Sequence, residues 1–310
     1  MVNFSAWAKE FRIRFLIFVS LPVCLGSAIA YTFYPGSFSL LYFGLAALAM
    51  LLLHAGTIIT NDYFDFVSGT DVINKARTPY SGGSGLLPDG VLRPGHVLAV
   101  GLLCFALCTA LGLYIVAFRS PAVLLVGMAG VALGLAYTTP PLKLCYRGLG
   151  EAARFIATPL IVLGAFLVQV PIASTAELQP ALPALTACLA SSVPVALLNT
   201  AALYIFEFPD YEADSRVGKR NLVVRLGPWK AAYLFLGMQA IAYLSLLAFI
   251  LSGIVPVTAA LAFVLLPASA YAALGLLRHS AEAKKLLPYL RASSHVYIAS
   301  SIILALAFVV

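Results

Sequence analysis

Two short acidic motifs carry the side chains with the clearest chemical potential in this sequence. The first spans residues 61–71 and the second spans residues 210–214. Within each motif, polar residues four apart share one face of a helix. Carboxylates gathered on one face suit Mg²⁺, which takes one or two of them and fills its shell with water and substrate phosphate oxygens. We expect the two motifs to face each other and to hold a diphosphate through bridging Mg²⁺, with the candidate ligands Asn61, Asp62, Asp65, Asp71, Asp210 and Asp214.

Basic residues follow each acidic motif, as a diphosphate site requires. Carboxylates alone would repel a diphosphate, whereas Arg offers a forked contact to phosphate and Lys a point charge. A single aspartate beside a helix end is usually just solvated. Two acidic clusters in equivalent positions, each with nearby cations, indicate a site. The candidate phosphate contacts are Arg77, Lys143, Lys219 and Arg220.

Two polar residues lie deeper in the helices that carry the motifs. His54 precedes Asp65 by 11 residues, and Asn199 precedes Asp210 by the same number. Eleven residues are close to three helical turns, so each side chain lies beneath its own aspartate, about 16 Å further along the helix. Both are candidates for an acceptor pocket. Hydrogen bonding between helices is the alternative interpretation and stays open.

The glycine-rich stretch 79–85 lies between the first motif and the next apolar segment. Its glycines suit a mobile lid, or a loop that offers backbone N–H groups to phosphate. A plain flexible connection has the same composition, so both interpretations stay open.

The elements that must position these residues are membrane-spanning helices. The chain has 310 residues, of which 62% are hydrophobic and only 10% charged, whereas a soluble domain carries about 25% charged residues. A span needs about 20 apolar residues. The sequence therefore predicts an all-α membrane protein with a single domain over residues 1–310, built from two four-helix halves and a ninth helix. The nine predicted spans cover about 15–34, 38–60, 97–118, 121–139, 155–173, 183–205, 231–252, 257–277 and 293–310.

The distribution of charge predicts the orientation of these spans. With the N-terminus in the cytoplasm, 18 of the 19 Lys and Arg residues fall in inside segments, and only Arg119 falls outside. Both acidic motifs then lie on the cytoplasmic side of a cell (inner) membrane. A cleaved signal peptide is the alternative for the first apolar run. We expect the lipid bilayer as a partner and no nucleic acid.

At these motifs the chain resembles the UbiA superfamily of intramembrane prenyltransferases. Asn61 and Asp65 match the first motif of that family, and Asp210 and Asp214 match the second. The runs 147–151 and 214–227, together with Gly69, resemble the menaquinone-type branch. The stretch 207–209, Glu-Phe-Pro, departs from the Asn and Arg that many relatives carry there. A CDP-alcohol phosphotransferase also has aspartates in a membrane, but its Asp-Gly…Ala-Arg signature is missing.

The resemblance implies a Mg²⁺-dependent transfer of a prenyl group from a prenyl diphosphate to an aromatic acceptor. Asp65, Asp210 and Asp214 would be catalytic through the metal, and the Tyr137 ring would shield the allylic cation. The branch implies 1,4-dihydroxy-2-naphthoate as acceptor, with 4-hydroxybenzoate, homogentisate or haem as alternatives. The prenyl tail would lie in an apolar groove that is open to lipid.

A membrane transporter or a scaffold is the alternative class of protein. Transporters usually place ionisable groups near the middle of the bilayer, with broken helices and inverted repeats. The acidic motifs of this chain are predicted at one membrane edge instead, which favours an enzyme.

Overall fold

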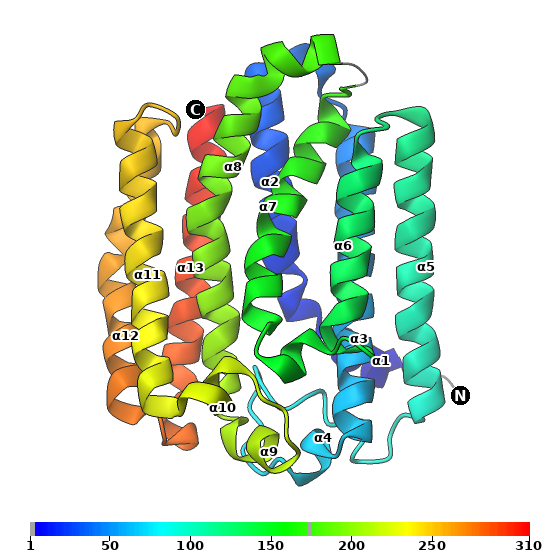
Figure 1. Cartoon of the computed structure of the whole chain (residues 1–310), viewed down its shortest axis with the longest axis vertical. Helices are drawn as coiled ribbons and strands as arrows, with labels where there is room; N and C mark the ends of the chain where they lie inside the picture. Colours follow the sequence, from blue (N-terminus) through cyan, green and yellow to red (C-terminus); the bar gives the residue numbers. More distant parts are fainter. Residues whose placement is uncertain (1–3, 173–174) are drawn as a thin grey trace.

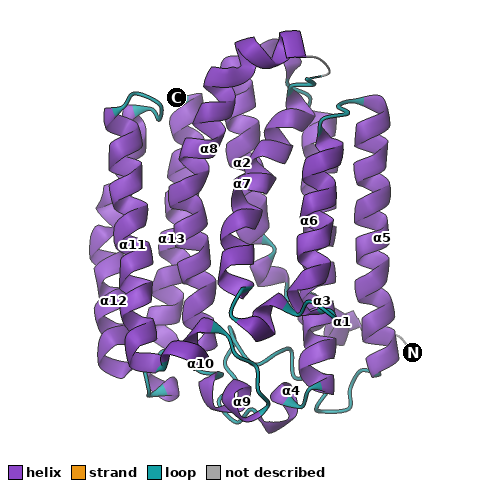
Figure 2. Cartoon of the chain, viewed as in Figure 1, coloured by secondary structure: helices purple, strands orange, loops and turns teal. Residues whose placement is uncertain are grey.

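In the computed structural model, the chain is a bundle of long helices that stand side by side (Figure 1). The structure describes residues 4–172 and 175–310. No strand occurs in these two ranges, so the predicted all-α class is confirmed (Figure 2). The long helices are α2 (Ile17–Phe33), α3 (Leu40–Val67), α5 (Pro94–Phe118), α6 (Val123–Thr138), α7 (Gly150–Gln169), α8 (Thr175–Tyr204), α11 (Pro228–Leu251), α12 (Leu266–His279) and α13 (Leu287–Val309).

The predicted count of nine spans is not confirmed. Over the described residues, seven helical segments are long and apolar enough to cross a membrane, and an eighth is a bent pair, Phe4–Phe15 with Ile17–Phe33. Helix α6 has 16 residues and is about 24 Å long, which is shorter than a hydrocarbon core of about 30 Å. Residue 173, the last of the fifth predicted span, lies outside the described residues.

The first span is bent by 47° between its two parts. Helix α1 (Phe4–Glu10) comes first, and Arg12 then takes a left-handed backbone conformation with φ 44° before a short 3-10 turn, Ile13–Phe15. Few non-glycine residues adopt left-handed backbone dihedrals. At Arg12 these dihedrals interrupt the right-handed helix, and the chain changes direction there. The bend lets α1 leave the line of α2 and brings Arg12 to the first acidic motif.

The largest packed core joins α2 to the helices of the second half of the chain, from α7 to α13. It contains large buried side chains such as Phe166, Tyr204, Phe235 and Tyr297. Helix α8 contributes small buried residues, including Ala184, Ala187 and Ser191, which let neighbouring helices approach closely.

Most of the short elements gather at one end of the bundle, which we call the motif end (Figure 1). They include α4 (Thr70–Ile73), α9 (Tyr211–Arg216) and α10 (Leu222–Leu226). Both acidic motifs lie there, and the C-terminus lies at the opposite end. The segments predicted to lie on one side of the membrane are therefore grouped at one end of the protein.

Candidate active site

The first acidic motif occupies the last turns of α3 and the start of α4. Helix α3 continues to Val67, seven residues past the predicted end of its span. Asn61 and Asp65 share a face, and the Asn61 amide donates to Asp65 Oδ2 at 2.8 Å. Gly69, with φ 86°, ends the helix and lets α4 begin with Asp71 buried. Asn61, Asp65 and Asp71 all line one cavity.

The second motif lies on the short helix α9, opposite the first. Asp210 precedes the helix, and its two oxygens accept hydrogen bonds from Asn74 Nδ2 at 2.7 Å and from Gly82 N at 3.0 Å. Asp214 accepts from Asn221 Nδ2 at 2.8 Å. Both aspartates line the same cavity as the first motif. The predicted juxtaposition of the two motifs is therefore present.

Lys219 joins the two motifs. Its ammonium lies 2.9 Å from Asp65 Oδ2 and 3.6 Å from Asp214 Oδ1. Burial alone would lower the pKa of Lys219, but Asp214 and Asp65 hold that pKa well above its ordinary value. The lysine is therefore charged and lies between one carboxylate of each motif.

Crowding of buried carboxylates changes their protonation. Burial, followed by the nearby Asp65 and Asp62, raises the pKa of Asp71 to about 8. Burial also raises the pKa of Asp214 to about 8, although Lys219 acts in the opposite direction. Burial and the repulsion between these carboxylates therefore favour a bound proton or a bound cation at this end of the cavity.

The oxygen atoms of the two motifs fit Mg²⁺. Asp214 Oδ1 is buried, and no hydrogen-bond partner for it occurs among the described residues. Across the same residues, no three His, Cys, Asp or Glu side chains converge on one point. Mg²⁺ does not need such a cage, because one or two carboxylates with water and substrate phosphate complete its shell. A site of this kind forms fully only with the diphosphate present.

The glycine-rich stretch closes over the motifs. Gly82 and Gly83 have φ of 77° and 70°, and a Cβ added to Gly83 would lie 2.1 Å from Asp71 Oδ2. Only glycine therefore fits at this contact. Arg77 organises the same stretch, because its guanidinium donates to Gly82 O at 2.8 Å and to Asp71 O at 3.0 Å. Arg77 does not line the cavity, so its predicted direct contact with phosphate is not seen.

Asp62, predicted as a supporting metal ligand, is directed away from the cavity. Its carboxylate accepts hydrogen bonds from Arg12 Nη2 at 2.6 Å and from Ser84 N at 2.8 Å. It is three residues from Asp65, which places it about 60° away around the helix. The structure therefore corrects the prediction: Asp62 ties the N-terminal segment and the glycine-rich stretch to α3.

Two predicted phosphate contacts also lie outside the cavity. Lys143 Nζ is 5.1 Å from the ring centre of Tyr146, and Arg220 lines a separate pocket. The residue that reaches the first motif from this loop is Tyr146, whose hydroxyl donates to Asp65 Oδ1 at 2.6 Å. Tyr146 gave no signal in the sequence, because its contact with Asp65 spans 81 positions.

The cavity of about 700 Å³ continues from the motifs between the helices. One face of α3 lines it from Asp65 back to Ala46, with residues spaced three or four apart, which corresponds to about 28 Å of helix. Most of the wall is apolar. A cavity of this shape and chemistry accommodates a long hydrocarbon whose charged end lies at the motifs.

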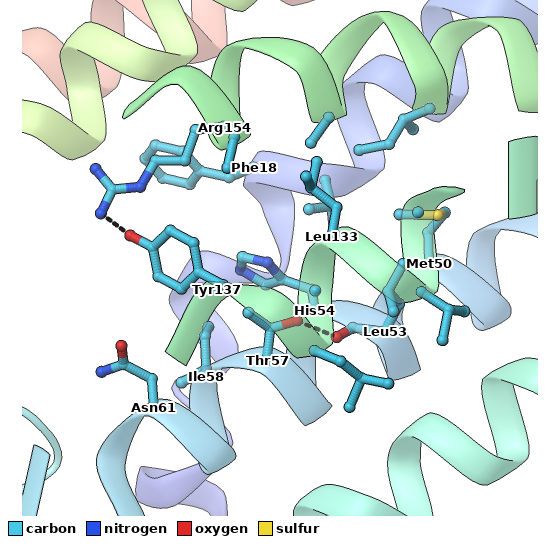
Figure 3. A pocket seen from close by; sticks show the side chains of 18 of the residues that line it. Phe18, Met50, Leu53, His54, Thr57, Ile58, Asn61, Leu133, Tyr137 and Arg154 are labelled. Carbon is cyan, nitrogen blue, oxygen red and sulfur yellow. Dashed lines mark hydrogen bonds between the residues drawn. The ribbon is translucent and has the colours of Figure 1, made fainter. Parts of the chain in front are cut away.

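Polar side chains also line the cavity deeper in the bundle than the motifs, and together we call them the polar chamber: His54, Tyr137, Arg154, Asn199 and Glu207. His54 and Asn199 both line the cavity, as does Tyr137 at the end of α6. Figure 3 shows Arg154 on α7 directed at Tyr137, and the Arg154 guanidinium donates to the Tyr137 hydroxyl. Arg154 also pairs with Glu207 at 2.9 Å. The sequence placed Arg154 among the flanking charges and did not identify this pair.

Fold and site together define an integral membrane protein with an acidic cavity at one end of a helix bundle. Residues 19–306 match the UbiA prenyltransferase family. The chain belongs to this family, which confirms the resemblance seen in its motifs, and membership implies transferase activity.

Relatives with assigned names are moderately similar to the chain. A 1,4-dihydroxy-2-naphthoate octaprenyltransferase of Bacillus subtilis is 28% identical over 234 residues, which are 75% of this chain and 70% of that protein. A UbiA prenyltransferase domain-containing protein 1 of Danio rerio is 31% identical over 67% of this chain and 57% of its own length.

Solved structures share the fold. The apo structure of a UbiA homolog from Aeropyrum pernix K1 has a TM-score of 0.59 at 20% identity, over 95% of this chain and 97% of that one. A UbiA homolog from Archaeoglobus fulgidus bound to DMAPP and Mg²⁺ has a TM-score of 0.54 at 16% identity, over 98% of each chain.

Proposed function

We propose that this protein is a Mg²⁺-dependent prenyltransferase that moves a prenyl group from a prenyl diphosphate to an aromatic acceptor. The observation that carries the proposal is the meeting of two acidic motifs across one cavity, with Lys219 2.9 Å from Asp65 and 3.6 Å from Asp214. Membership of the family and a relative solved with DMAPP and Mg²⁺ support the same activity.

The diphosphate would lie between the two motifs. The residues that would hold Mg²⁺ are Asn61, Asp65, Asp71, Asp210 and Asp214, which all line the cavity. The bound ion would stabilise the charge that develops on the leaving diphosphate. Lys219 would turn from the carboxylates to a phosphate oxygen, because Mg²⁺ then neutralises Asp65 and Asp214 in its place.

The transfer consists of one bond broken and one bond formed. The C1–O bond of the prenyl diphosphate breaks, and its electron pair leaves with the diphosphate. An aromatic carbon of the acceptor then bonds to C1, and the ring loses a proton, or carbon dioxide where it carries a carboxylate. The Tyr137 ring lines the same cavity, and its face would shield the allylic cation.

A 1,4-dihydroxynaphthalene ring is the acceptor that we propose, with 1,4-dihydroxy-2-naphthoate as its first form. The support comes from the relatives named for that substrate in Bacillus subtilis, Mycobacterium tuberculosis and Escherichia coli, at 28% identity each. The product would be a menaquinone precursor. The motif end would face the cytoplasm of a cell (inner) membrane, since 18 of the 19 basic residues then lie inside.

An acceptor panel tests this function. Purified protein in lipid nanodiscs receives one prenyl diphosphate, Mg²⁺, and in turn 1,4-dihydroxy-2-naphthoate, 4-hydroxybenzoate, homogentisate or haem b. We expect a prenylated product from the naphthoate alone. Prenylation of 4-hydroxybenzoate, with none of the naphthoate, would reject the acceptor assignment and keep the prenyltransferase class. Counterflow of a radiolabelled substrate without diphosphate release would instead identify a transporter.

A further inference from the structure

A buried ion pair forms one side of the polar chamber. Arg154 Nη1 lies 2.9 Å from Glu207 Oε1, and the two side chains are 19% and 12% exposed. The other terminal nitrogen of Arg154 donates to the Tyr137 hydroxyl, as Figure 3 shows. All three side chains line the cavity that the motifs also line. In the proposed function, the acceptor ring would lie in this region, next to C1 of the prenyl group.

Arg154 already has a direct carboxyl partner in the chamber. Glu207 is its direct partner, and Glu151, in the first turn of α7, acts on the same pair from close by. Two carboxyl groups therefore lie close to one guanidinium, and of these Glu207 lines the cavity whereas Glu151 does not. A carboxylate on the acceptor would have to displace Glu207 to gain a forked contact with Arg154, and a buried Glu207 without a partner is costly.

Apart from Arg154 Nη1, which forms the ion pair with Glu207 but no hydrogen bond, the polar atoms of the chamber that lack a partner among the described residues are acceptors. The buried atoms His54 Nε2, Asn199 Oδ1 and Glu207 Oε2 have no hydrogen-bond partner within the described part of the chain. The Asn199 amide nitrogen donates to Thr158 Oγ1 at 3.1 Å, and the other nitrogen of His54 bonds the backbone of Phe15. A neutral imidazole that donates through this nitrogen would present the Nε2 lone pair to the cavity. Atoms of this kind are complementary to a ligand that brings donors.

We propose that the acceptor is selected through its hydroxyl groups, and that the Arg154–Glu207 pair keeps the chamber from selecting a ring carboxylate. This inference rests on the proposed function, because it names which substituents of the proposed ring are recognised. Glu207, Asn199 and His54 are the specificity-determining residues, and a ring hydroxyl donates to at least one of them. The ring carboxylate, where present, lies away from Arg154 and leaves as carbon dioxide.

Two matched rings test the inference on the wild-type protein. Under anaerobic conditions, kcat/KM is measured for 1,4-dihydroxy-2-naphthoate and for 1,4-naphthalenediol, which differs by the carboxylate alone. We expect the two values to agree within about tenfold, because no unpaired cation awaits the carboxylate. Methylation of both hydroxyls should remove binding: 1,4-dimethoxynaphthalene should inhibit with a constant at least about 100-fold above the KM of the diol.

Variants of the Arg154–Glu207 ion pair provide a second test of the inference. Glu207→Gln keeps the shape of the side chain but frees Arg154, so its preference for the carboxylated ring should rise by about tenfold or more. The double variant E207Q/R154M removes both charges and should return to the wild-type ratio. The control is Glu282→Gln, an exposed carboxylate paired with Lys285, which should leave the ratio unchanged. Size-exclusion profiles and the KM for the prenyl diphosphate show whether each variant is folded.

The outcomes separate the inference from the proposed function. A wild-type protein that prefers the carboxylated ring by more than about 100-fold, with the preference lost in Arg154→Met, would show that Arg154 binds the carboxylate and would overturn the inference. The proposed function would stand in that case. If neither ring were prenylated while the prenyl diphosphate still bound, the proposed acceptor class would fail, and the inference with it.

Discussion

Lys219 is the residue whose removal the structure describes most fully. It is buried, and its ammonium contacts one carboxylate from each acidic motif. Lys219→Met keeps most of the side-chain length and removes the charge. The variant would leave Asp65 and Asp214 facing each other across the cavity without their shared cation.

The distances give the scale of the effect. At an effective dielectric constant of 20, charges 2.9 and 3.6 Å apart attract each other by about 6 and about 5 kcal/mol. Desolvation of the buried lysine offsets most of this sum, and removal of one partner of a buried pair typically costs about 3–5 kcal/mol. Asp65 keeps Asn61 and Tyr146 as donors, so we expect a loss near the lower end, about 3 kcal/mol.

Mg²⁺ should compensate for the missing lysine. A ligand at 100 times its dissociation constant stabilises the folded state by about 2.7 kcal/mol. In the wild-type protein, Mg²⁺ must compete with Lys219 for the same oxygens, whereas in the variant those oxygens are free. The stability of Lys219→Met should therefore depend more strongly on Mg²⁺ than that of the wild type.

The assay is the temperature at which half of the detergent-solubilised protein loses its monodisperse elution peak, with EDTA or with saturating Mg²⁺. We expect the variant to unfold at a lower temperature in EDTA and to recover most of the difference in Mg²⁺. Lys230→Met, at an exposed lysine of α11, is the matched control and should behave as wild type. Equal stability of Lys219→Met and wild type in EDTA, with the same KM for the prenyl diphosphate, would refute the role given to Lys219.

Three further predictions concern protons, the glycine-rich stretch and orientation. The pKa of Asp71 and of Asp214 is raised to about 8, so both bind protons at neutral pH that Mg²⁺ must displace. Mg²⁺ affinity measured by calorimetry should therefore rise from pH 6 to about 8. The metal-free protein should lose stability over the same range, because its folded state binds more protons than its unfolded state. A Mg²⁺ affinity and a stability that do not change with pH would contradict the raised pKa values. Gly83→Ala should lower prenyl transfer by at least about tenfold, because the added methyl group displaces Asp71. The control Gly90→Ala, at φ 69° with open space around it, should lose stability only. Equal activity of the two variants would contradict the contact between Gly83 and Asp71. Cysteines introduced at residues 61–95 and 210–220 should react with impermeant reagents from the cytoplasmic side alone, and periplasmic or luminal labelling would reverse the orientation.

Much of the site followed from spacing along single helices. Residues four apart share a helix face, so the pairing of Asn61 with Asp65 was predictable, and both residues line the cavity. The 11-residue spacing likewise placed His54 and Asn199 along the cavity wall. Their role at the acceptor stays a prediction.

Contacts between distant segments were not predictable, because nothing local encodes them. Asn74 bonds Asp210 across 136 positions, and Arg12 bonds Asp62 across 50 positions. Asp62 therefore looked like a ligand in the sequence, although its carboxylate is committed to Arg12 and Ser84. The sequence predicted more membrane spans than the structure confirms. One reason is α6, because hydropathy alone does not show that this helix has only 16 residues.

The first motif depends on a helix that continues beyond its apolar run. The sequence predicted an end near residue 60, whereas α3 continues to Val67. The last turns carry buried polar side chains, whose cost is offset by partners such as Tyr146 and Lys219 from other segments. Boundaries set by tertiary partners are the part of a helix that hydropathy does not locate.

The central claim is that two acidic motifs hold a metal-bound diphosphate, and one measurement tests it most directly. Release of radiolabelled diphosphate from a prenyl diphosphate is followed with Mg²⁺ or with EDTA, for wild type, Asp65→Asn and Asp214→Asn. The account predicts Mg²⁺-dependent release by the wild type and a fall of at least about 100-fold in each folded variant. Near-normal turnover by either variant in EDTA would contradict it.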